Sequence, residues 1–178
     1  MGLVYIASVT ASADATVEFT TGIDATYNEY QFHMVNMHPA TDSVDFTFQV
    51  NADGQTGFNE TITSSYFIAQ HTESDSLTLL GYNTLRDQAQ GTSYQPMTHQ
   101  LGADADQAFS GVLTLYAPSS TTYVKHFVSN TNAGNAYDRT QNTYAAGYIN
   151  TTAAIDEISF AFSSGNIDAG TIHMYGVG

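Results

Sequence analysis

The sequence predicts an all-β fold built as an antiparallel β-sandwich. Hydrophobic residues recur at every second position in many short segments, and no segment shows the spacing of an amphipathic helix. Clusters of Gly, Pro, Asn and Ser separate these segments, as turns do. The polar residues are mostly Thr, Ser, Asn and Gln, which suit strands and turns better than helix interiors. Together these observations favour a jelly-roll-like sandwich in a single domain over residues 1–178.

Four segments show the alternation most clearly, and nine or so strands are expected in all. The residues expected to share a face are Tyr30, Phe32 and Met34; Val44, Phe46, Phe48 and Val50; Tyr123, Lys125 and Phe127; and Ile158, Phe160 and Phe162. Polar neighbours such as His33, Thr47 and Gln49 should face outward. Further strands are predicted within 3–9, 16–21, 76–82, 111–117 and 171–177.

Turns are predicted at 51–54, 117–120, 132–135 and 163–166. Two stretches are less regular. Residues 60–75 are equally compatible with a strand or a loop, and a short helix there stays open. Residues 85–107 form a long polar connection, where we first expect contacts with a partner.

The charge balance excludes several classes of partner. The chain has 17 acidic residues and three strong bases, Arg86, Lys125 and Arg139, for a formal net charge of −14. Three scattered bases cannot neutralise phosphates, so we expect no nucleic-acid partner and no binding to anionic membranes. There is no cysteine, which excludes disulfides and thiolate chemistry. The first residues lack the basic region of a secretory signal.

The six histidines suggest a metal site only weakly. His33 and His38 are five residues apart, so on a regular strand they should point to opposite faces. The other four, His71, His99, His126 and His173, lie in separate segments. We therefore predict no metal ligands and favour histidines that are solvated or hydrogen-bonded on strands.

Acidic residues offer no better site. The segment from Asn51 to Gly54 resembles the start of a calcium loop but lacks its later ligands, so a hairpin turn with Gly54 at positive φ is expected. Asp104 and Asp106 leave a weak cation site open. The pairs Glu73 with Asp75 and Asp156 with Glu157 look solvated. No nucleophile elbow or phosphate-binding glycine loop occurs. We predict no catalytic residues, no cofactor and no enzymatic activity.

Tyrosines near turns and strand ends suggest a contact surface. Such rings can bury one side and hydrogen-bond on the other, as a subunit interface or a sugar-binding platform requires. About half of them could instead be ordinary aromatics at the edge of the core. The residues concerned are Tyr82, Tyr94, Tyr116, Tyr137, Tyr144 and Tyr148.

The C-terminal segment FAFSSGNIDAGTIHMYGVG, residues 160–178, resembles the closing hairpin of β-sandwich virion proteins of tailed bacteriophages, including marine and cyanobacterial phages. In this hairpin Ile167, Ile172 and Met174 should reach the core, while Gly165 and Gly170 let the backbone turn or bulge. The resemblance covers about a tenth of the chain. It supplies no catalytic residue.

The resemblance implies a non-enzymatic structural protein exposed on a phage particle as a capsid decoration, fibre or tail component. Its location would be the virion, after assembly in the host cytoplasm. Its partners would be copies of itself, with a trimer favoured by analogy, and other virion proteins such as the major capsid protein or the tail. The chain has a single Lys, and lysines on edge strands are what usually discourages pairing with other chains. This shortage also favours a closed homo-oligomer, in which the sheet edges are covered. The alternative is a carbohydrate- or receptor-binding module that contacts host surface glycans.

Overall fold

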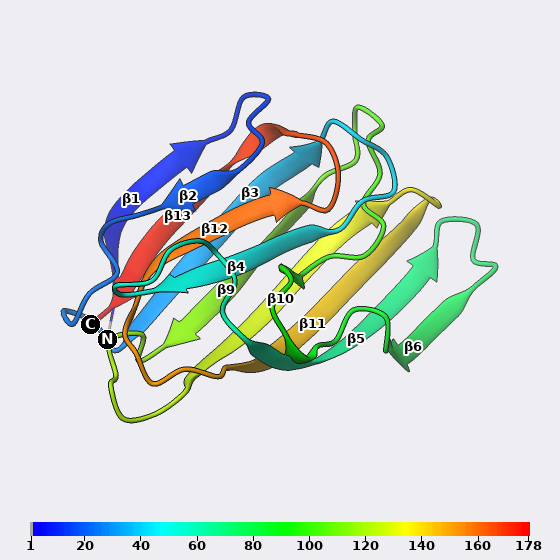
Figure 1. Ribbon diagram of the computed structural model, residues 1–178. Helices are drawn as coiled ribbons and strands as arrows, with labels where there is room; N and C mark the ends of the chain where they lie inside the picture. Colours follow the sequence, from blue (N-terminus) through cyan, green and yellow to red (C-terminus); the bar gives the residue numbers. More distant parts are fainter. Residues whose placement is uncertain (1) are drawn as a thin grey trace.

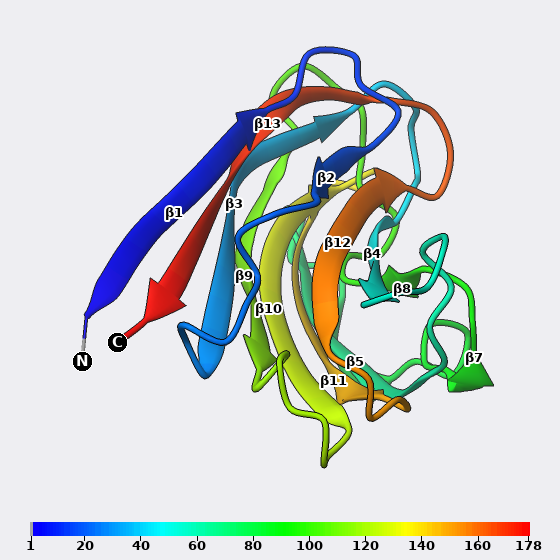
Figure 2. The same cartoon turned by 60° about the vertical axis from the view of Figure 1, so that its left-hand side comes forward.

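The structure is a computed structural model that describes residues 2–178, and it confirms the all-β antiparallel sandwich. Two antiparallel sheets of unequal size pack against each other (Figure 1). The larger one curves around the smaller one (Figure 2). No helix in the described part of the chain is long and apolar enough to cross a membrane.

The larger sheet has nine strands. Eight of them lie in the order β1 (Leu3–Thr10), β13 (Ile167–Val177), β3 (Glu29–Pro39), β9 (Phe109–Tyr116), β10 (Lys125–Asn135), β11 (Arg139–Ile149), β5 (Ile62–Thr72) and β6 (Thr78–Tyr82). The short β7 (Ala89–Gly91) also pairs with β5. The smaller sheet has the order β2 (Val17–Phe19), β12 (Ile155–Phe162), β4 (Phe46–Ala52) and β8 (Gln95–Pro96).

The core lies between the two sheets and is rich in phenylalanine. Phe46 of β4 contacts Phe109 of β9 at 4.8 Å and Phe162 of β12 at 4.9 Å between ring centroids. Phe160 lies 5.5 Å from Phe32 across the sheets. These inward-facing residues are those that the alternation predicted, because every second residue of a strand points to the same face. The predicted sets at 30–34, 44–50 and 158–162 are all buried.

The outward side of β4 differs from the prediction, because it is buried as well. Thr47 and Gln49 were expected to face solvent, but loops cover them. The side-chain amide of Gln49 donates to the carbonyl oxygens of Glu60, Thr92 and Ser93 at 3.0–3.1 Å. These bonds satisfy a wholly buried polar side chain and fasten two loops to the strand.

The structure has thirteen strands rather than about nine. The ambiguous stretch 60–75 contains the strand β5, and β11 was not predicted at all. The predicted turn at 132–135 lies inside β10, and the chain turns at 136–138 instead. Tyr123 does not share a strand with Lys125 and Phe127, because it precedes β10 and is exposed.

The connection 85–107 is not a free polar loop. It contains β7 and β8, and Gln95, Met97, Thr98 and Leu101 are completely buried. Thr98 Oγ1 accepts a hydrogen bond from the Phe46 amide at 2.7 Å. Much of this segment therefore closes one end of the sandwich.

The C-terminal segment is not the hairpin that was predicted, because β12 lies in the smaller sheet and β13 in the larger one, so these two strands do not pair with each other. The predicted burial and glycine conformations are nevertheless found. Ile167, Ile172 and Met174 are fully buried. Gly165 and Gly170 have φ of +73° and +119°, and the pairing of β13 with β3 shifts register between Ile167 and Ala169 and again across Gly170. A side chain at position 170 would also meet the Met37 backbone at 2.7 Å. Gly54 has the expected positive φ, +77°, in a turn closed by the Gln55 amide and the Ala52 carbonyl. The turn does not form the predicted hairpin, because β4 and β5 belong to different sheets.

Candidate functional site

The histidines do not converge on a metal centre. β3 bulges at Asn36, which has φ of +50°, so Met34 and Met37 both enter the core. The bulge adds one residue, and His33 and His38 therefore lie on the same outer face, which corrects the prediction of opposite faces. Among residues 2–178 no group of three or more His, Asp or Glu side chains is placed to hold a metal ion.

His33 is positioned by its neighbours on the outer face. It pairs with His173 across β3 and β13 and bonds Gln31 Oε1 through Nε2 at 2.9 Å. Its ring also lies 4.9 Å from the ring of Tyr175. Burial lowers the pKa of His33, and the nearby His173 lowers it further. His33 is thus held neutral within a hydrogen-bonded row on the sheet.

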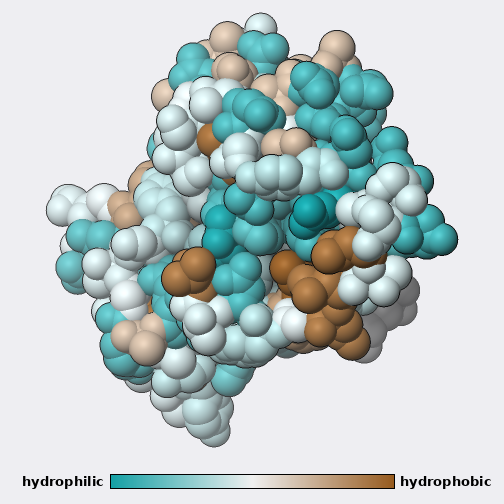
Figure 3. Space-filling model, turned by 90° about the vertical axis from the view of Figure 1, so that its right-hand side faces the viewer, coloured by the Kyte–Doolittle hydropathy of each residue, from teal (hydrophilic) through white to brown (hydrophobic). Residues whose placement is uncertain are grey.

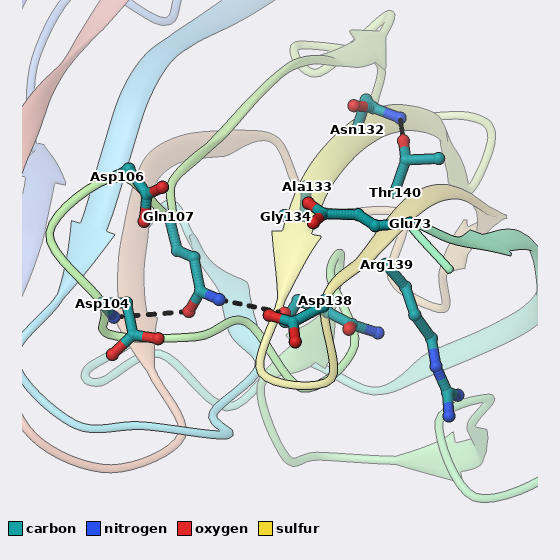
Figure 4. A pocket seen from close by; sticks show the side chains of 11 residues that line it. Glu73, Asp104, Asp106, Gln107, Asn132, Ala133, Gly134, Asp138, Arg139 and Thr140 are labelled. Atoms are coloured by element: carbon teal, nitrogen blue, oxygen red, sulfur yellow. Dashed lines mark hydrogen bonds between the residues drawn. The ribbon is translucent and has the colours of Figure 1, made fainter. Parts of the chain in front are cut away.

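A polar pocket of about 440 Å³ lies where the loop before β9 meets the turn between β10 and β11 (Figure 4). Gln107 binds this corner together, since its side chain accepts from the Asp104 amide at 3.3 Å and donates to the Asn135 carbonyl at 3.3 Å. Figure 4 shows the carboxylates of Asp104, Asp106 and Asp138 spread around the pocket, with the Arg139 guanidinium extending away. The arrangement favours a solvated acidic rim over a cation site.

All three strong bases have structural roles. Lys125 is completely buried and donates to the carbonyl oxygens of Thr151, at 3.2 Å, and Ala153. Arg86 forms an ion pair with Asp45 at 3.0 Å. Arg139 contacts Gln70 Oε1 at 3.4 Å and lies 5.2 Å from the Tyr137 ring. The described surface is therefore almost purely acidic in its charged groups.

A second, polar layer fills the core where the smaller sheet ends. Gln141 of β11 donates to the His99 carbonyl at 3.0 Å and accepts from Asn135 Nδ2 at 3.2 Å. Gln70 donates to the same Gln141 oxygen. Burial, helped by the positive charge of Arg86, lowers the pKa of His99 to about 4. The His99 side chain beside this layer is therefore neutral at pH 7.

This burial makes stability depend on pH. The pKa of His99 is about 4 in the folded chain, against 6.5 for an ordinary solvated histidine. As pH falls, the unfolded chain therefore binds a proton before the folded chain does. The stabilisation is complete above pH 6.5 and is lost between about pH 6.5 and 4. Allowing for the partial exposure of the ring, we expect a loss of about 1–2 kcal/mol.

Urea unfolding at a series of pH values measures this loss. The matched variant is His99→Gln, which cannot titrate but keeps the backbone carbonyl that binds Gln141. Its stability should fall less than that of the wild type over this interval. Parallel pH profiles for the two proteins would contradict the prediction.

The outer face of the larger sheet carries a row of aromatic and amide side chains. Cross-strand pairing places Asn130 opposite Tyr144, and Tyr144 opposite Phe67. The rings of Phe67 and Tyr144 are stacked, with centroids 5.0 Å apart and planes at 13°. Beside them lies a depression of about 320 Å³ whose lining is uncharged: Ser110, Gly111, Val112, Asn130, Thr131, Asn132 and Asn142. We call these residues, with Tyr144, the amide platform.

Both edges of the larger sheet expose apolar side chains. β1 exposes Leu3, Val4 and Tyr5, and β6 exposes Leu79, Leu80 and Tyr82. Figure 3 looks from the side of β6 and shows apolar residues grouped on a largely hydrophilic surface. Neither edge strand contains a Lys, Arg or Pro that would discourage pairing with another chain.

The tyrosines singled out in the sequence divide between these settings. Tyr82 and Tyr144 lie on the β6 edge and the amide platform, and Tyr116 and Tyr137 are also exposed. Tyr94 and Tyr148 are half-buried, and Tyr94 bonds Ser159 Oγ at 3.1 Å. Phe67 and the asparagines of the amide platform were not singled out in the sequence. Phe67 stacks on Tyr144 from a neighbouring strand, and only the pairing of β11 with β5 could have shown this contact.

Comparisons with protein-family models, with curated proteins and with solved structures found no significant match to this chain. The function is therefore argued from the two apolar edges, the acidic surface and the amide platform.

Proposed function

We propose that this chain is a non-enzymatic structural protein of a bacteriophage particle, exposed on the surface as a capsid decoration, fibre or tail component, and that it works as a homo-oligomer. The observation that carries the proposal is the pair of unprotected apolar edges on one sheet. An isolated sheet with such edges invites association with further strands. The sequence resemblance of residues 160–178 to a segment of phage virion proteins supports the particle setting.

The two edges are chemically different surfaces at opposite ends of the same sheet. A contact of β1 from one copy with β6 from the next is heterologous, and heterologous contacts close into rings when the rotation allows. A ring of three copies would cover the β1 and β6 edges of every larger sheet. This agrees with the trimer that the analogy with phage proteins favours.

The acidic surface supports a peripheral position on the particle. With Lys125 buried and Arg86 paired to Asp45, the described chain presents little positive charge to DNA. Such a surface is repelled by the packaged genome and resists nonspecific association. Contacts with other virion proteins would then use the apolar edges or basic groups supplied by the partner.

Gradient-purified particles of a phage that encodes the chain provide the test. Mass spectrometry should find the chain in the particles, and antibodies against the folded chain should label intact particles on the outside. A chain that is made during infection but is absent from purified particles would refute the proposal.

A further inference from the structure

We propose that the amide platform is a binding site for a neutral sugar ring, which stacks on Tyr144 and hydrogen-bonds to the asparagines beside it. The proposal goes beyond the assembly role and does not depend on it. It rests on the placement of Tyr144, on the hydrogen-bonding state of the amides and on the absence of charge in the depression.

Tyr144 has one ring face stacked on a neighbour and stands next to a residue that lines the depression. It lies between Phe67 and Asn130 in the cross-strand row, and one face stacks on Phe67. The other face is therefore on the side of Asn130, which lines the depression. The ring is 38% exposed, so it is both held in place and accessible. A fixed aromatic face beside polar groups suits the apolar face of a sugar ring.

The asparagines are positioned by bonds among themselves and to the backbone. The Nδ2 of Asn142 donates to Asn130 Oδ1 and to the Thr131 carbonyl, both at 2.8 Å. The Nδ2 of Asn132 donates to Thr140 Oγ1 at 3.1 Å.

These bonds leave specific atoms unused. Within residues 2–178, Asn130 Nδ2 and the Oδ1 atoms of Asn132 and Asn142 have no protein partner. One donor group and two acceptors thus remain free on residues that line the depression. Vicinal hydroxyls, each of which donates and accepts, can pair with such a set.

The size and charge of the site select the ligand class. A volume of about 320 Å³ is at the lower end of ordinary small-molecule sites, so one or two rings would be held. No lining residue carries a charge, and the whole chain has a net charge of −14. An acidic sugar would find no cation here and would be repelled by the surrounding surface. The site therefore favours neutral hexoses and N-acetylhexosamines.

The experiment screens the whole chain on an array of neutral oligosaccharides of glucose, galactose, mannose and N-acetylglucosamine. Sialylated oligosaccharides on the same array provide the negatively charged comparison, called the sialylated arm. Binders are then titrated by nuclear magnetic resonance, following the side-chain amides of the asparagines. We expect binding of a neutral oligosaccharide, insensitive to salt, that shifts the Asn130 and Asn142 signals.

Two variants and a control locate the site. Tyr144→Ala and Asn142→Ala should each weaken binding about tenfold or more, which is the usual cost of removing a central contact. Tyr144→Phe should keep most of the affinity. The control is Tyr123→Ala, which removes a more exposed tyrosine in the loop before β10.

Three results would overturn the proposal: no neutral sugar bound with a Kd below about 1 mM, binding that survives Tyr144→Ala in a folded variant, or preference for the sialylated arm. Circular dichroism establishes that each variant folds. The assembly proposal has a separate readout, because Tyr144→Ala leaves the Leu3 and Leu80 side chains of the two sheet edges in place.

Discussion

Replacing Asp45 with alanine is expected to lower the free energy of unfolding by about 3–5 kcal/mol. Asp45 Oδ2 lies 3.0 Å from Arg86 Nε, an ion pair without the alignment of a full hydrogen bond. Asp45 Oδ1 accepts from Arg86 Nη2 at 3.4 Å and from the Gln100 amide at 2.8 Å. Both charged side chains are less than one-fifth exposed, at 17% and 15%. Removing the carboxylate would leave a buried guanidinium without its counter-charge.

Urea denaturation measures this effect, and a double variant identifies its cause. Replacing Asp45 with leucine and Arg86 with methionine removes both charges and should cost less than Asp45→Ala alone, because no unpaired charge remains. A loss below about 0.5 kcal/mol for Asp45→Ala, as at ordinary surface sites, would show that the pair does not hold the 85–107 segment in place.

Phe46→Ala should cost a similar amount, about 3–5 kcal/mol. The ring is completely buried and joins the two sheets through Phe109 and Phe162. Its removal loses apolar burial and leaves a cavity that a closely packed sandwich cannot fill.

Phe67→Ala is the matched control for Phe46→Ala. It removes the same side chain from a strand of the larger sheet, but this ring is 41% exposed on the outer face. Its loss should be well below that of Phe46→Ala when both variants are unfolded in urea. Equal losses would mean that Phe46 does not connect the sheets as described.

The sequence predicted the strands whose core side is apolar. Phe46, Phe48 and Val50 alternate with polar residues, and Ile158, Phe160 and Phe162 do the same, so the pattern of period two identified both strands. The turn and the bulge around the start of the last strand were also predicted, from Gly165 and Gly170. The hairpin itself was wrong, because the chain crosses from the smaller sheet to the larger one between β12 and β13.

The strands with a polar inner side were harder to recognise. In β5 and β11 the buried positions include Gln70, Gln141 and Thr143. These side chains bond one another, and Gln141 also bonds the His99 carbonyl and the Asn135 side chain. Hydrophobic alternation cannot reveal a side chain whose burial depends on partners far along the chain. For the same reason, the burial of Thr47 and Gln49 on the outward side of β4 could not be predicted.

The candidate sites depend on register, which the sequence leaves open. Tyr144 was singled out, but its stacking on Phe67 requires β11 to pair with β5 in one alignment. The predicted turn at 132–135 would have shifted the pairing of Asn130 with Tyr144. The bulge at Asn36 likewise changed the face of His38, because a single inserted residue reverses the alternation.

The mass of the intact chain in solution, measured by light scattering after size-exclusion chromatography, tests whether the protein forms a closed oligomer. The protein should run as a closed oligomer, with three chain masses favoured. Leu3→Lys and Leu80→Lys should each break it, because a heterologous contact uses both edges. Tyr123→Lys adds the same charge away from the edges and should leave the mass unchanged. A single chain mass of 19.2 kDa at every concentration would contradict the account.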